Sequence, residues 1–86
     1  MKIITKDIFE ASYLLAMGMR LTDILGDRKT VLFQFEGTKE LEALKSKYDK
    51  GRAEVNIRRF RNSMNVVRDK LFEALEQRRQ GAAASY

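Results

Sequence analysis

The clearest pattern of hydrophobic and polar positions lies in the last third of the chain. From residue 57 onward, apolar residues recur every three or four positions, as they do along one face of an α-helix; the stripe consists of Ile57, Phe60, Met64, Val67, Leu71 and Leu75. Asn56 suits the N-cap, and Val55 and Phe60 occupy the two positions of a hydrophobic staple. We therefore predict a helix over residues 56 to 78 whose stripe faces the core.

Two shorter helices are predicted upstream. Thr5 or Asp7 can cap a helix over residues 6 to 17, and Gly18 can end it in the left-handed conformation that glycine adopts readily. Thr38 can cap a second helix over residues 38 to 50, which Gly51 ends.

Between these helices the apolar residues alternate, as in β-strands. Residues 19 to 25 and 30 to 36 read as two strands joined by a hairpin loop at 26 to 29, with Val31, Phe33 and Phe35 on the core face. Residues 2 to 4 and 52 to 55 could each add a short strand. The predicted fold class is α+β: an antiparallel hairpin, extended to three strands if one of these segments joins it, packed against three helices of which the C-terminal one is longest. We expect one domain over residues 1 to 79 and a flexible tail over 80 to 86.

The composition narrows the chemistry. The 86 residues include no cysteine and no histidine, so thiol nucleophiles, disulfides, imidazole bases and the usual zinc ligands are all missing. No phosphate-binding glycine loop or other catalytic motif is present, and we expect neither an enzyme nor a cofactor, metal or small-molecule substrate. No apolar run reaches the roughly 20 residues of a membrane span, and residue 2 is already charged, so we expect a cytoplasmic protein without membrane contact.

Positive charge gathers toward the C-terminal end of the sequence. The formal net charge is +5, and seven of the nine arginines lie in residues 51 to 86. Arg58, Arg59 and Arg61 fall at the start of the predicted long helix, where the helix dipole favours acids instead. Farther along, Asn65 and Arg68 extend the same flank.

Three explanations for these arginines stay open. Carboxylates such as Asp23, Glu36 or Glu54 could fold over to pair with them, or the arginines could form a solvated face, as charge runs on helices often do. Alternatively, they could bind an anionic partner, because the planar guanidinium group suits phosphate.

The chain also resembles a known family. The opening TKDIFEASYLLAMGMRL, the strand VLFQFE and the segment VNIRRFRNSMNVVRDKLF are similar to a family of short bacterial and phage-borne proteins described only as a domain of unknown function. The resemblance covers roughly residues 4 to 72 and is carried by Thr5-Lys6-Asp7, Ala11, Leu14, Gly18 and the Phe33-x-Phe35-Glu36 strand. It implies a compact α+β domain and a mobile-element origin, and it implies no reaction or site residues.

Two functional hypotheses follow. The favoured one is a non-enzymatic, largely non-specific DNA- or RNA-binding protein; its predicted contact residues are Arg58, Arg59, Arg61, Asn65 and Arg68, with Arg28 and Lys29 at the hairpin tip. The alternative is a protein–protein interaction or assembly module. In either case we expect a homodimer or a partner protein, because a short sheet has edges to complete and a long apolar helix exceeds what this chain can cover.

Overall fold

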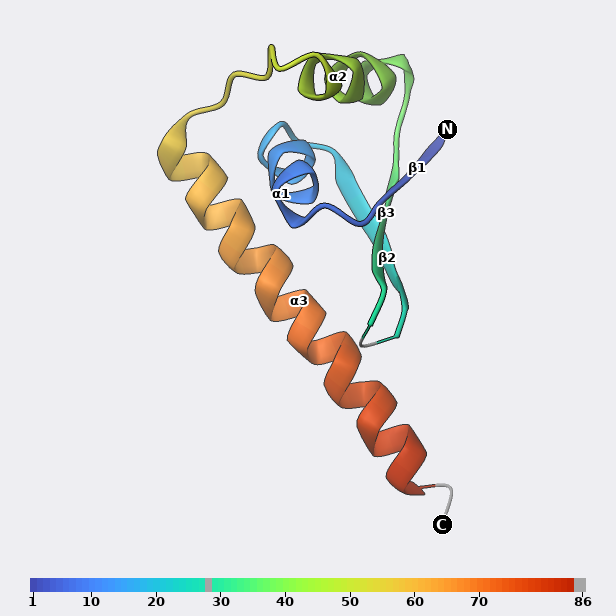
Figure 1. Ribbon diagram of the computed structural model, residues 1–86. Helices are drawn as coiled ribbons and strands as arrows, with labels where there is room; N and C mark the ends of the chain where they lie inside the picture. The colour runs from blue at the N-terminus through green and yellow to red at the C-terminus, as the bar shows by residue number, and fades with distance from the viewer. Residues whose placement is uncertain (28, 85–86) are drawn as a thin grey trace.

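The computed structural model describes the backbone of residues 1–27 and 29–84, and the side chains of residues 1–27 and 29–77. Within that part the elements follow one another as β1 (Lys2–Thr5), α1 (Ile8–Ala16), β2 (Arg20–Gly26), β3 (Val31–Glu36), α2 (Lys39–Asp49) and α3 (Ile57–Ala84) (Figure 1). The predicted α+β class is confirmed, as is α3 as the longest helix.

The sheet is antiparallel with β3 in the middle, in the order β1-β3-β2. Phe35 lies opposite Ile3 on one side and Leu21 on the other, so these side chains share the core face. A register shift between Leu21 and Asp23 marks a β-bulge in β2, which increases the local twist of that edge.

Of the two additional strands considered, only one forms. The N-terminal segment pairs with β3 as β1. The prediction of a strand over residues 52 to 55 was wrong, because that segment connects α2 to α3 and uses Ala53 and Val55 to pack on the core instead of making ladder hydrogen bonds.

The first helix begins and ends as its sequence predicts. The Asp7 side chain accepts a hydrogen bond from the Phe9 amide at 2.9 Å, which satisfies one of the free N–H groups at the helix start. At the other end Gly18 has φ of +90°, and the Met19 amide donates to the Leu14 carbonyl at 3.0 Å. These contacts form the expected glycine C-terminal cap.

Helix α1 lies between the sheet and α3 (Figure 1) and supplies much of the core. Ala11 and Leu14 are fully buried, Phe33 and Phe35 cover them from the sheet, and Val67 covers them from α3. Because nearly every side of α1 meets another element, the helix depends on both neighbouring layers.

Polar contacts attach α2 to α1. The Lys45 Nζ atom lies 3.2 Å from an oxygen of Glu10, whose side chain is only 4% exposed, and 3.6 Å from Asp49. The Tyr48 hydroxyl donates to Asp7 at 2.6 Å. Burial alone would lower the pKa of Lys45, but the hydrogen bond and charge of Glu10 outweigh it and raise that pKa.

The long helix departs from its predicted packing at both ends. Val67 is fully buried, and Phe60 and Leu71 pack partly buried against the core. Ile57 is 84% exposed, so its prediction as a core residue was wrong. The first turn of α3 extends past the elements that cover Val67. The helix also continues past residue 78, to Ala84, while residues 85 and 86 of the predicted tail lie outside the described residues.

Candidate nucleic-acid interface

The start of α3 presents its arginines to solvent. The Asn56 side chain accepts a hydrogen bond from the Arg59 amide at 3.1 Å and thereby caps the helix, as predicted. Arg58, Arg59 and Arg61 follow within the first two turns, and all three are exposed. No acidic residue lies in the first turn, so nothing local offsets the positive end of the helix dipole.

The carboxylates proposed as internal partners do not reach these arginines. Within residues 1–27 and 29–77, the ion pairs join Lys45 to Glu10 and to Asp49, so none involves an arginine of α3. Asp23 instead accepts a hydrogen bond from the Ile24 amide at 2.8 Å. Internal pairing is therefore excluded for that part of the chain, which leaves a solvated face or an anionic partner.

A shallow groove runs along the first turns of α3. Its volume is about 680 Å³, and its lining residues are Asn56, Ile57, Arg58, Arg61, Asn62 and Asn65. The groove brings together three of the predicted contact residues, Arg58, Arg61 and Asn65. It combines two guanidinium groups with three side-chain amides, which can donate to phosphate oxygens.

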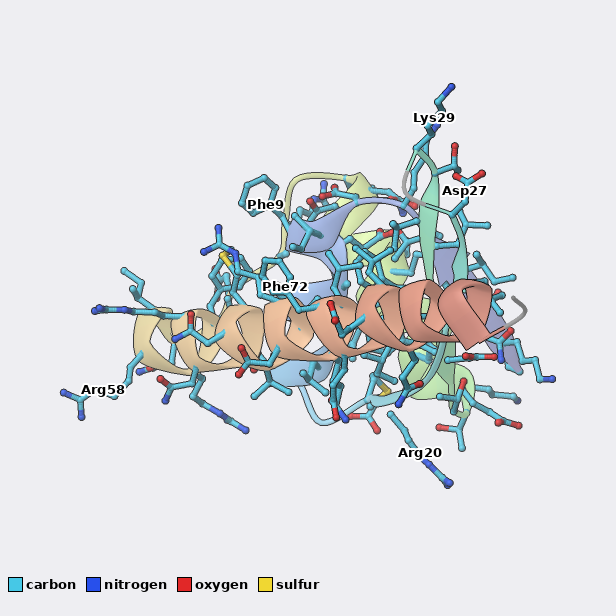
Figure 2. All side chains as sticks on the ribbon, turned by 90° about the horizontal axis from the view of Figure 1, so that it is seen from below. Phe9, Arg20, Asp27, Lys29, Arg58 and Phe72 are labelled. Carbon is cyan, nitrogen blue, oxygen red and sulfur yellow. The ribbon has the colours of Figure 1, made fainter. Side chains whose placement is uncertain are left out.

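The remaining predicted contact residues lie elsewhere. Arg68 follows Arg61 by about two turns on the same flank, whereas Arg59 points about 160° away from Arg61 at 100° per residue. Lys29 sits at the hairpin tip, far from Arg58, at the opposite end of the molecule in Figure 2. Arg28 lies outside the described residues.

Three groove residues were not predicted as contacts: Ile57, Asn62 and Asn56, which was expected only as the helix N-cap. Asn62 occupies the position four residues after Arg58, so helical spacing could have placed both on one face. For Ile57 the sequence predicted a buried side chain instead, because this residue belongs to the apolar stripe that was expected to face the core.

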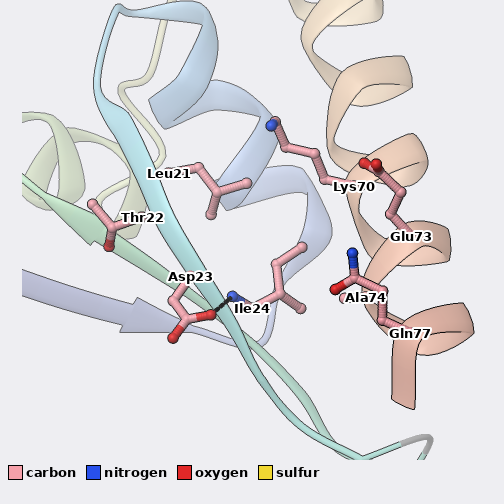
Figure 3. Close-up of a pocket in the computed structure, with 8 residues that line it drawn as sticks. All are labelled: Leu21, Thr22, Asp23, Ile24, Lys70, Glu73, Ala74 and Gln77. Carbon is pink, nitrogen blue, oxygen red and sulfur yellow. Dashed lines mark hydrogen bonds between the residues drawn. The ribbon is translucent and has the colours of Figure 1, made fainter. Parts of the chain in front are cut away.

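A second groove, of about 460 Å³, separates β2 from α3 (Figure 3). It is lined by Leu21, Thr22, Asp23, Ile24, Lys70, Glu73, Ala74 and Gln77. Its lining residues carry charges of both signs. The Asp23 carboxylate accepts a hydrogen bond from the Ile24 amide on the strand that borders the groove (Figure 3). This groove therefore lacks the single-sign charge of the first, and its strand is protected by a bulge and an acidic side chain, two devices that discourage edge pairing.

The described part of the chain has neither a cluster of metal-ligating side chains nor a membrane-spanning helix. There, no cluster of three or more acidic, histidine or cysteine side chains could hold a metal ion. Nor does any described helix combine the length and apolar character needed to cross a membrane.

The family of the chain follows from its comparison with family models. The model for "Domain of unknown function (DUF5659)" matches residues 1–73. The chain belongs to the DUF5659 family. The DUF5659 match contains β1, β2, β3, α1 and α2, and it ends two residues after Leu71, which is the last core-packing residue of α3 among the side chains that the structure describes. All of the predicted contact residues fall inside it.

No curated protein matches this DUF5659 chain, and no solved structure matches it. The geometry of the molecule is therefore the basis for any assignment of function.

Proposed function

We propose that the protein binds nucleic acid through the start of α3, without catalysis and largely without sequence specificity. The observation that supports this proposal is the exposure of Arg58, Arg61 and Arg68 on a helix where the described carboxylates leave them unpaired. Arginine in such a setting binds phosphate oxygens well, because its planar group donates two parallel hydrogen bonds.

The position of these residues adds a second electrostatic contribution. The free N–H groups and partial positive charge at a helix N-terminus attract anions, so a phosphate near Arg58 would interact with both the side chain and the helix end. Contacts of this kind recognise the sugar–phosphate backbone and carry little sequence information. They do not distinguish DNA from RNA.

The test is a salt titration of binding to a labelled mixed-sequence oligonucleotide, followed by fluorescence anisotropy. Replacing Arg58, Arg61 and Arg68 together by Gln should lower the slope of log K against log salt by about two to three units, because each lost phosphate contact removes about 0.7 to 0.9. Thermal stability should change little, since all three side chains are exposed.

A matched control variant removes the same charge elsewhere. Lys6, Lys39 and Lys47 are exposed residues outside α3, and replacing them by Gln lowers the net charge by the same amount. This control should retain most of the native slope. Absence of binding by the native protein at low salt would disprove the proposal, and equal effects of the two triple variants would reduce it to general attraction by net charge.

The second candidate function is a protein–protein interaction or assembly module. It is favoured by the exposure of large apolar side chains, with Ile57 at 84% and Ile4 at 51%.

A cytoplasmic location, which we also propose, is consistent with the absence of cysteine. The mobile-element origin stays a prediction that rests on the resemblance alone.

A further inference from the structure

Phe72 is exposed on the same flank of α3 as two of the arginines. The residue leaves 70% of its surface accessible, although phenylalanine is usually buried. It lies four residues after Arg68 and eleven after Arg61. At 100° per residue, these three side chains fall within about 40° of one another around the helix axis.

A second exposed ring lies on the same side of the helix. Phe9, in the first turn of α1, is 55% exposed, and Figure 2 shows Phe9 and Phe72 on one side of α3. Lys70, Glu73 and Gln77, which line the groove beside β2, lie about 100° to 160° around the helix axis from Phe72. The flank with Arg61, Arg68 and Phe72 is therefore separate from that groove.

We propose that this flank, which we call the arginine–phenylalanine flank, binds single-stranded nucleic acid, with phosphates on Arg61 and Arg68 and a base stacked on Phe72. The inference rests on the proposed function and specifies its ligand. In a duplex the faces of the bases are covered by their neighbours, whereas a single strand can place a base flat against an aromatic ring.

The dimensions fit a short stretch of one strand. Arg61 and Phe72 are about 16 Å apart along the helix axis. A strand that keeps the duplex rise of about 3.4 Å per nucleotide covers that distance with about five nucleotides, and a more extended strand covers it with fewer. About five nucleotides lie within the range of site sizes for single-strand-binding domains. The charge favours this occupant over an apolar segment of protein, because a strand carries regularly spaced negative charge and the described carboxylates leave both arginines unpaired.

The test compares a labelled single strand of about 12 nucleotides, long enough to fill such a site, with the same strand annealed to its complement. The native protein should bind the single strand more tightly. Phe72→Ala should weaken single-strand binding about 5- to 100-fold, the effect expected for loss of one stacked base, while duplex binding and the salt slope stay nearly unchanged. Val66→Ala, which removes an exposed apolar side chain (42% exposed) more than 100° away around α3, should have no effect.

A direct readout of stacking is also available because the sequence contains no tryptophan. In Phe72→Trp the new ring should retain single-strand affinity, and its fluorescence should be quenched when the strand binds. A circular dichroism spectrum matching the native one confirms that each variant folds.

The outcomes separate this inference from the proposed function. If the native protein binds neither nucleic acid, both are overturned. If it binds but Phe72→Ala leaves the single-strand affinity unchanged, or weakens single-strand and duplex binding equally, only the single-strand inference is overturned. Unquenched tryptophan fluorescence in the bound Phe72→Trp variant would overturn it as well.

Discussion

Asp7 joins the start of α1 to the end of α2 through the two oxygens of its carboxylate. One oxygen accepts from the Phe9 amide and caps α1, and the other accepts from the Tyr48 hydroxyl. Burial alone would raise the pKa of Asp7, but these hydrogen bonds outweigh it and lower that pKa from its usual 3.8. For Tyr48, burial and the hydrogen bond to Asp7 act together and raise the pKa to about 12.

These shifts predict how stability depends on pH. Asp7 contributes stability above its unfolded pKa of 3.8 and loses that contribution as the pH falls through its lower folded value. Tyr48 contributes stability that is complete below its unfolded pKa of 10.0 and is lost as the pH rises toward about 12. The bond between them is therefore strongest across the neutral range.

Replacing Tyr48 by Phe should test this bond. We expect urea denaturation at neutral pH to show a loss of about 1 to 2 kcal/mol in the free energy of unfolding, the usual contribution of a hydrogen bond to a charged group at a partly exposed site. The difference from the native protein should shrink in acid, where Asp7 is protonated, and again above pH 10.0. A difference that stays constant across this range would show that the hydroxyl acts only through packing.

Local contacts were the predictable part at this scale. The caps at Asp7, Thr38 and Asn56 each involve residues two or three positions apart, so the residue types alone identify them. The bond between Asp7 and Tyr48 joins positions 41 residues apart. No sequence pattern indicates such a pair before the fold is known.

At the scale of elements, α3 shows how far periodicity can be trusted. Spacing identifies which residues share a face, but only the neighbouring elements determine how much of that face is covered. Val67 meets the core whereas Ile57, on the same predicted stripe, extends past it. The prediction of strand pairing had a similar limit. Residues 2 to 4 and residues 52 to 55 showed equally short strand patterns, but only the first segment joins the sheet, as β1.

A pair of alanine substitutions measures this difference along α3. Val67→Ala should lower the free energy of unfolding by about 2 kcal/mol, because it removes fully buried methyl groups and leaves a cavity. Ile57→Ala should change it by less than about 0.5 kcal/mol, since the side chain is already in water. Equal losses in thermal or urea denaturation would mean that the start of α3 is covered in solution, by a second molecule or another part of the chain.

The candidate site was predictable in composition and only partly in arrangement. The sequence identified the arginines and their flank, since Arg61, Asn65 and Arg68 follow helical spacing. It could not decide whether carboxylates would pair with them, because that depends on where β2 and the loop before α3 lie. No sequence pattern indicated a role for Phe72, because its exposure follows from the position of α1 against the opposite face of α3.

At the scale of the whole molecule, the two faces of the sheet differ, because the helices α1 and α3 pack on one face only (Figure 1). The molecule measures 48 × 27 × 19 Å, and α1 and α3 lie on one side of the sheet (Figure 1). Ile4, which pairs with Gln34, points to the other face, with Leu25 and Leu32 half-buried on it. The bulge and Asp23 protect the β2 edge of the sheet against pairing with another strand. The open face that carries Ile4 is therefore a better candidate than the β2 edge for contact between two copies.

We therefore predict self-association through the open face of the sheet. The molar mass from light scattering should rise with concentration for the native protein, because apolar residues on a sheet face gain from mutual burial. Ile4→Lys should keep the protein monomeric, whereas the control Ile57→Lys should not. A native protein that stays monomeric up to about millimolar concentration, where even weak dimers form, would rule out the dimer.

The position of α1 between two layers determines how the chain can fold. Its covers come from distant parts of the sequence: β3 and α2 supply one side, and Val67 with Leu71 supplies the other. Neither the N-terminal half nor the C-terminal half contains both, so neither half can bury this helix alone. The protein must therefore fold as one cooperative unit, in which the docking of α3 onto α1 closes the longest loop and comes at the greatest entropic cost.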